Sequence, residues 1–99
     1  MYKMDRAEIL DKLLLYKISH QQDYMLLKLG VFGSFAQNND TIASDLDVVV
    51  ELKKPDLFIL GNIKTELEQI IGKKVDIIRL RENMNPFLKK RILKESIYV

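Results

Sequence analysis

Three short groups of residues carry side chains that could act together in one chemical step. Gly33-Ser34 follows an apolar segment, Asp45-Leu46-Asp47 comes after residues 35–44, and Asp76 lies further along the chain. Because successive side chains of a strand point to opposite faces, Asp45 and Asp47 should share one face, about 7 Å apart, while Leu46 points into the core. If the strand that carries Asp76 pairs beside this one, a third carboxylate joins the first two.

Such a group of carboxylates predicts a metal site. Ionised carboxylates that lie close together repel one another, and a divalent cation between them relieves that repulsion. The chain contains no cysteine, so a thiolate site is excluded, and a set of oxygen ligands selects Mg²⁺ or Mn²⁺ over zinc. We therefore predict that Asp45, Asp47 and Asp76 bind a metal ion.

Gly33 and Ser34 have the chemistry of a phosphate-binding turn. A glycine lacks a Cβ, so a phosphate can approach its backbone, and amide hydrogens at a turn that enters a helix point toward that anion. The Ser34 hydroxyl can add one more donor. A phosphate turn beside a metal site suits a nucleoside triphosphate that is held for in-line nucleotidyl transfer.

The apolar pattern predicts the elements that must position these residues. A helix should begin after Asp5, because Asp5 and Glu8 have the spacing of a capping box. A second helix should end at Gly72, and a third should begin at Asn85-Pro86. The expected strands are residues 26–32, 45–51 and 75–80, with a polar loop over 37–44 and a short apolar tail, 97–99, that either adds an edge strand or packs on a partner.

A strand, a helix and a strand in sequence favour a parallel pair, so residues 75–80 should lie beside residues 45–51. We expect an α+β fold, with a mixed β-sheet of about three to four strands packed with helices. The aromatic side chains should belong to the core, whereas His20 should be a surface or capping residue without a catalytic role. These core aromatics are Tyr24, Phe32, Phe35, Phe58 and Phe87.

Composition restricts the function. The chain has 99 residues, of which 47% are hydrophobic and 30% charged, so we expect one globular domain over residues 1–99. No apolar run is long enough to cross a bilayer, which predicts a cytoplasmic protein without a membrane partner. The net charge of +2 gives no reason to expect direct nucleic-acid binding.

A basic cluster near the C-terminus consists of Lys89, Lys90, Arg91 and Lys94. This cluster could face a phosphate-bearing ligand or an acidic partner, although a solvated helix face is favoured.

The site residues resemble those of a known family. Gly33-Ser34, residues 35–44, then Asp45-Leu46-Asp47, with Val75-Asp76 downstream, is similar to the nucleotidyltransferase superfamily typified by DNA polymerase β. The small size resembles the minimal nucleotidyltransferases (MNT), antitoxins encoded beside helical HEPN toxins. This resemblance implies the two-layer nucleotidyltransferase fold. The chain departs from the family at Gln37-Asn38, where members often carry Arg-Gly, and so lacks a cation that could contact phosphate.

The resemblance also implies roles. Asp45 and Asp47 would hold Mg²⁺, with two ions expected, and Gly33 and Ser34 would bind the triphosphate of the substrate ATP. Asp76 would complete the metal site and help to deprotonate the acceptor hydroxyl. The family suggests transfer of AMP to a tyrosine of a HEPN-type toxin.

Two other functions fit the same residues. After the strand at 75–80 little chain remains to position an acceptor, so a partner or a second copy must present it, in a hetero-oligomer or a homodimer. The chain could be a catalytically weak or inactive binding module that neutralises a partner by covering it. It could also be a small-molecule nucleotidyltransferase of the aminoglycoside type, which would need a homodimer to build its acceptor pocket.

Overall fold

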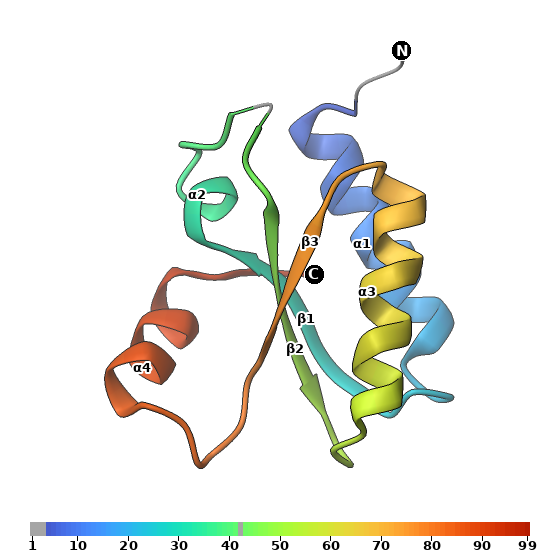
Figure 1. Ribbon diagram of the computed structural model, residues 1–99, viewed down its shortest axis with the longest axis vertical. Helices are drawn as coiled ribbons and strands as arrows, with labels where there is room; N and C mark the ends of the chain where they lie inside the picture. Colours follow the sequence, from blue (N-terminus) through green and yellow to red (C-terminus); the bar gives the residue numbers. More distant parts are fainter. Residues whose placement is uncertain (1–3, 42) are drawn as a thin grey trace.

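The computed structural model describes residues 4–41 and 43–99 and contains four helices and four strands within them (Figure 1). No helix in these two ranges is long and apolar enough to cross a membrane. In chain order the elements are α1 (Arg6–His20), β1 (Leu26–Phe32), α2 (Gly33–Ala36), β2 (Leu46–Leu52), α3 (Leu57–Ile71), β3 (Val75–Arg79), α4 (Pro86–Glu95) and β4 (Ile97–Tyr98).

The strands form one mixed sheet in the order β3-β2-β1-β4. β2 runs antiparallel to β1 and parallel to β3, and α3 makes the crossover between the parallel pair. The C-terminal tail adds β4 to the free edge of β1, which decides between the two alternatives for residues 97–99. The predicted α+β class with a mixed sheet is confirmed.

Local signals fix the helix ends where the sequence predicted them. The Asp5 side chain accepts a hydrogen bond from the backbone N–H of Glu8, and the reciprocal bond completes the capping box. The Asn85 side chain caps α4, which has Pro86 at its first position. Gly72 ends α3 in the left-handed conformation, with φ of 73°.

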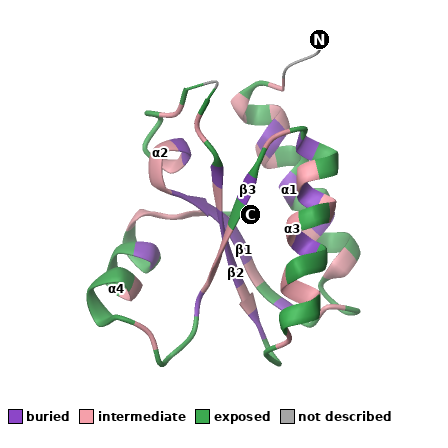
Figure 2. Cartoon of the chain, in the orientation of Figure 1, coloured by how far each residue is buried: buried purple, intermediate pink, exposed green. Residues whose placement is uncertain are grey.

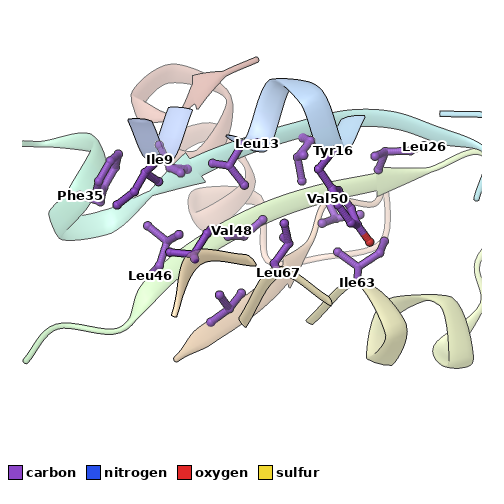
Figure 3. Packing of buried hydrophobic residues seen from close by; sticks show 14 of the residues in the cluster. Ile9, Leu13, Tyr16, Leu26, Phe35, Leu46, Val48, Val50, Ile63 and Leu67 are labelled. Carbon is purple, nitrogen blue, oxygen red and sulfur yellow. The ribbon is translucent and has the colours of Figure 1, made fainter. Parts of the chain in front are cut away.

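The larger core lies between one face of the sheet and helices α1 and α3 (Figures 2 and 3). Leu13 and Leu67 reach it from the two helices, and Val48 and Val50 reach it from β2; all four side chains are fully buried. Burial of this kind contributes about 1.5–3 kcal/mol for each large aliphatic side chain. This face supplies most of the apolar packing.

A smaller core covers part of the opposite face. Val49 alternates with Val48 and Val50, so it points the other way and packs with Phe32, Leu80 and Ile92 of α4. Figure 1 accordingly shows α4 across the sheet from α1 and α3.

Two predicted core aromatics are exposed. Phe58 and Phe87 are 87% and 80% exposed, whereas Phe32 and Phe35 are buried and Tyr24 is half-buried, as expected. Phe58 lies off the stripe of Ile63, Leu67 and Ile71 by which α3 meets the sheet, and Ile92 is the one buried residue among those described in α4. The other large apolar side chains of α4, Phe87, Leu88 and Leu93, are therefore exposed.

Gly30 allows the terminal strand to approach the sheet closely. It pairs with Tyr98, and a Cβ at this position would stand 2.9 Å from Cδ1 of Tyr98 and closer still to the backbone carbonyl of Ile97. β4 therefore depends on a glycine in the middle of β1.

Candidate active site

The alternation of side chains places the acidic residues on the face that α4 partly covers. Leu46 and Val48 point into the larger core, so Asp47 between them points to the opposite face. Val75 and Ile77 contact the larger core on either side of Asp76, which therefore projects to the same face as Asp47.

The register of the parallel strands brings two of the carboxylates side by side. Asp47 of β2 is the direct partner of Asp76 of β3, and neighbouring strands lie about 4.8 Å apart. Asp45 directly precedes β2 and is exposed, as is Asp76, whereas Asp47 is half-buried. The structure thus brings together the acids that the sequence singled out.

Gly33 lies directly against Asp47. It has a positive φ of 67°, and a Cβ built there would collide with Oδ2 of Asp47. Phe32, the residue before it, is the partner of Asp47 across β1 and β2. Both the left-handed backbone and the contact require glycine at position 33. The Gly33-Ser34 turn and the carboxylates therefore belong to one site.

The acidic group is electrostatically unbalanced. Burial raises the pKa of Asp47, and the charges of Asp76 and then Asp45 raise it further. A carboxyl with a raised pKa in such a group gains from a nearby cation. The three donors are all carboxylates, the ligand type that Mg²⁺ prefers, so the residues present fit this ion.

The positions of the side chains do not by themselves define a metal-binding site. Within residues 4–41 and 43–99, no three His, Cys, Asp or Glu side chains already stand in a metal-holding group. The predicted metal site therefore stays a prediction from the donor set and its electrostatics.

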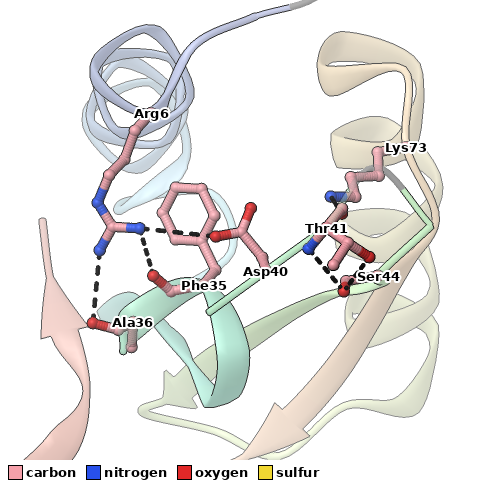
Figure 4. A network of polar contacts seen from close by, with 7 residues as sticks. All are labelled: Arg6, Phe35, Ala36, Asp40, Thr41, Ser44 and Lys73. Carbon is pink, nitrogen blue, oxygen red and sulfur yellow. Dashed lines mark hydrogen bonds and ion pairs between the residues drawn. The ribbon is translucent and has the colours of Figure 1, made fainter. Parts of the chain in front are cut away.

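Arg6 fixes the short helix α2 through contacts that sequence analysis did not predict. Its two terminal nitrogens donate to the carbonyls of Phe35 and Ala36, the second at 3.4 Å, and its guanidinium lies 4.4 Å from the centre of the Phe35 ring (Figure 4). It also pairs with Asp40 at 3.9 Å. Arg6 follows a helix cap, where a charged residue is ordinary, so only the tertiary structure reveals the contact.

The loop between α2 and β2 is tied down at both ends. The backbone N–H of Asn39 donates to the carbonyl of Ser34 at 2.7 Å. Near the other end, the backbone N–H of Thr41 donates to the Ser44 hydroxyl at 3.0 Å, and Lys73 donates to the carbonyl of Thr41 at 3.4 Å (Figure 4). These bonds hold the described residues on both sides of position 42, between the Gly33-Ser34 turn and Asp45.

Known proteins are similar in sequence to this chain. Residues 11–99 match the family described as Polymerase beta, Nucleotidyltransferase. MJ0128 of Methanocaldococcus jannaschii, named as a protein adenylyltransferase, is 34% identical over 94 residues, which cover 94% of this chain and 96% of that protein. Protein adenylyltransferase MntA of Thermococcus cleftensis is 27% identical over 100 residues, with both chains covered to 100%.

Solved structures share the fold. A structure described as a minimal nucleotidyltransferase superposes with a TM-score of 0.79 at 27% identity, over 95% of both chains. A complex of a tri-AMPylated Shewanella oneidensis HEPN toxin with an MNT antitoxin gives a TM-score of 0.67 at 16% identity, over 95% of this chain and 71% of that chain, which shows the fold alone.

These matches confirm the resemblance to minimal nucleotidyltransferases and the predicted enzyme class. The chain covers nearly the full length of MJ0128 and MntA, and the family match includes every predicted site residue from Gly33 to Asp76. The chain belongs to the polymerase beta nucleotidyltransferase family.

Proposed function

We propose that this protein is a Mg²⁺-dependent protein adenylyltransferase that transfers AMP from ATP to a tyrosine of a HEPN-type toxin and so acts as an antitoxin. The observation that carries the proposal is the contact of Gly33 with Asp47, beside Asp76 in register. It joins a phosphate turn to a group of carboxylates, which is what nucleotidyl transfer requires. Residues 1–99 would form one domain, and a cytoplasmic location stays a prediction.

The residues of the site have separate tasks in this proposal. Gly33 and Ser34 bind the triphosphate through backbone N–H groups and the Ser34 hydroxyl. Asp45, Asp47 and Asp76 would hold two Mg²⁺ ions. When bound, these ions would neutralise phosphate charge and stabilise the entering and leaving oxygens of the displacement.

The reaction is a displacement at the α-phosphorus of ATP. The acceptor hydroxyl oxygen forms a bond to this phosphorus, the bond to the bridging oxygen breaks, and pyrophosphate leaves. Asp76 takes the proton of the hydroxyl as a general base. The exposed position of Asp76 leaves room for a side chain that a partner presents.

Related proteins support the choice of acceptor. MntA of Thermococcus cleftensis is a protein adenylyltransferase, and the Shewanella oneidensis complex pairs an MNT antitoxin with an AMPylated HEPN toxin. We extend this to a hetero-oligomer of the present chain with a HEPN-type partner.

The test is the double variant Asp45→Asn/Asp47→Asn, incubated with ATP, Mg²⁺ and a small helical HEPN protein encoded beside this chain. The wild type should add the mass of AMP to a tyrosine of the partner and relieve its toxicity. The double variant should still bind the partner but add no AMP. If the double variant neutralises the partner fully, the chain acts as a covering module and the catalytic role of both aspartates is wrong.

A further inference from the structure

α4 packs beside the candidate active site, and its last turn reaches the residue that follows α2. Figure 1 shows α4 across the sheet from α1 and α3, on the face to which Asp47 and Asp76 point, whereas α2 packs Phe35 into the larger core. The amide nitrogen Nε2 of Gln37, which directly follows α2, donates to Oε1 of Glu95 at 2.8 Å. Gln37 therefore connects the end of α2 to the last turn of α4.

Glu95 in turn holds Arg91. The Nε of Arg91 donates to Oε2 of Glu95 at 3.2 Å, one helical turn away. The guanidinium carbon of Arg91 lies 5.5 Å from the centre of the Phe32 ring. Since Phe32 precedes Gly33 and pairs with Asp47, the Arg91 guanidinium lies next to the residues that frame the site.

The donors of Arg91 are mostly free. Of the three guanidinium nitrogens of Arg91, only Nε has a hydrogen-bond partner among the described residues. The Arg91 side chain is 59% exposed. A guanidinium with its two terminal nitrogens available can bind phosphate oxygens in a bidentate way. Arg6, by contrast, already donates to two carbonyls of α2 and pairs with Asp40.

We propose that Arg91 binds the triphosphate of the nucleotide held at the Gly33-Ser34 turn. The inference rests on the proposed function, because it takes a nucleoside triphosphate as the ligand of that turn. In this position the guanidinium compensates the negative charge that the leaving pyrophosphate gains as its bond to the α-phosphorus breaks. Gln37 and Glu95 are positioning residues that hold Arg91 over Phe32.

The experiment compares the binding of AMP-PNP and of AMP, both with Mg²⁺, by isothermal titration calorimetry. Arg91→Gln should weaken AMP-PNP about tenfold or more, since it removes a hydrogen bond to a charged group. AMP should bind as it does to the wild type, because AMP lacks the β- and γ-phosphates. Arg91→Lys keeps the charge but loses the bidentate guanidinium, so its affinity for AMP-PNP should lie between those of the wild type and of Arg91→Gln.

Lys90→Gln is the matched control. It removes the same charge one residue away, but Lys90 lines an open groove on the outside of α4 with Pro86 and Leu93. It should leave both affinities unchanged, and the melting temperature of each variant shows whether it is folded.

Three results would overturn the inference while leaving the proposed function intact. The first is that Arg91→Gln binds AMP-PNP as tightly as the wild type. The second is that Arg91→Gln loses affinity for AMP and for AMP-PNP by the same factor. The third is that Lys90→Gln loses as much affinity for AMP-PNP as Arg91→Gln does. The second result would show that Arg91 acts only through the packing of α4. A wild type that binds neither nucleotide would contradict the proposed function as well as the role of Arg91.

Discussion

The two faces of the sheet have different compositions. The face under α1 and α3 is closed by aliphatic side chains that are almost entirely buried. The face under α4 has only a small apolar cluster, and Asp47 and Asp76 point to this face. Burying like charges costs free energy, so a fold can carry them where another surface supplies the stability. The difference indicates that one face supplies most of the apolar packing, while the other carries the candidate active site.

The largest expected effect comes from a substitution in the larger core, which tests whether the two faces of the sheet act independently. Leu67→Ala removes a fully buried side chain, and we expect the free energy of unfolding to fall by about 2–5 kcal/mol, measured in urea. The affinity of the remaining folded protein for AMP-PNP should not change. Leu93→Ala, which truncates a 47% exposed side chain of α4, should cost less than about 1 kcal/mol. A loss of nucleotide affinity in folded Leu67→Ala would show that the faces are not independent.

Gly33→Ala tests the contact between Gly33 and Asp47 at the candidate active site, and Gly72→Ala at the end of α3 is its control. The left-handed backbone should cost about 1–2 kcal/mol in the alanine variant, and the new Cβ would displace the Asp47 carboxylate, so nucleotide binding should be lost. Gly72→Ala has a similar φ of 73° but meets no atom within 4 Å. It should lose the same stability and keep full affinity. Equal affinities in the two variants would contradict the role of the Gly33 contact.

Asp47→Asn should act in opposite directions on stability and on metal binding. It removes a charge that Asp76 and Asp45 repel, so the metal-free protein should gain a small amount of stability, since solvent screens part of the repulsion. We expect Mg²⁺ with ATP to raise the melting temperature of the wild type, and this rise should disappear in the variant. Differential scanning fluorimetry with and without Mg²⁺ measures both effects, and a variant that is less stable without metal would count against repulsion at this site.

The smallest expected effect concerns pH and lies on the face of α1 and α3. Tyr16 and Tyr24 both donate to Oε1 of Glu66, at 3.1 and 2.7 Å, and the rings of both lie against His20. The hydrogen bond to Glu66 and then burial raise the pKa of Tyr24 to about 12. The folded state therefore holds this proton more tightly than the unfolded state, and its stability should fall as the pH rises from about 10 toward 12.

Glu66→Gln removes the charge next to Tyr24 and should shift its titration toward pH 10, which the absorbance of tyrosinate reports. Nucleotide binding at neutral pH should not change. A titration that is identical in the variant and the wild type would show that Glu66 does not control Tyr24.

The site could be predicted further than the surfaces around it. The helix ends depend on residues that are close in sequence, such as Asp5 with Glu8 and Asn85 with Pro86, so a short window contains the whole signal. The convergence of Asp47 and Asp76 followed from side-chain alternation and from the parallel pair that one crossover helix implies. These rules use period and length alone.

Contacts between distant segments could not be predicted. Arg6 is bound to residues 35 and 36, and Gln37 is bound to Glu95. No pattern in the neighbouring sequence of these residues predicts their distant partners. The exposure of Phe58 and Phe87 was missed because hydrophobicity predicts burial only where a helix meets its neighbours. Their positions in the first turns of α3 and α4 lie outside those contacts.

The close packing of β4 over Gly30 has a consequence for solubility. Within the described residues, β4 and the hydrogen bond from the backbone N–H of Val99 to the carbonyl of Leu29 cover this edge of β1, and uncovered edges recruit other chains by strand pairing. Any side chain at position 30 would lift the terminal strand from the sheet. We therefore expect a larger residue at position 30 to expose this edge and to promote self-association by strand pairing, although position 30 lies in neither helix packing nor the candidate active site.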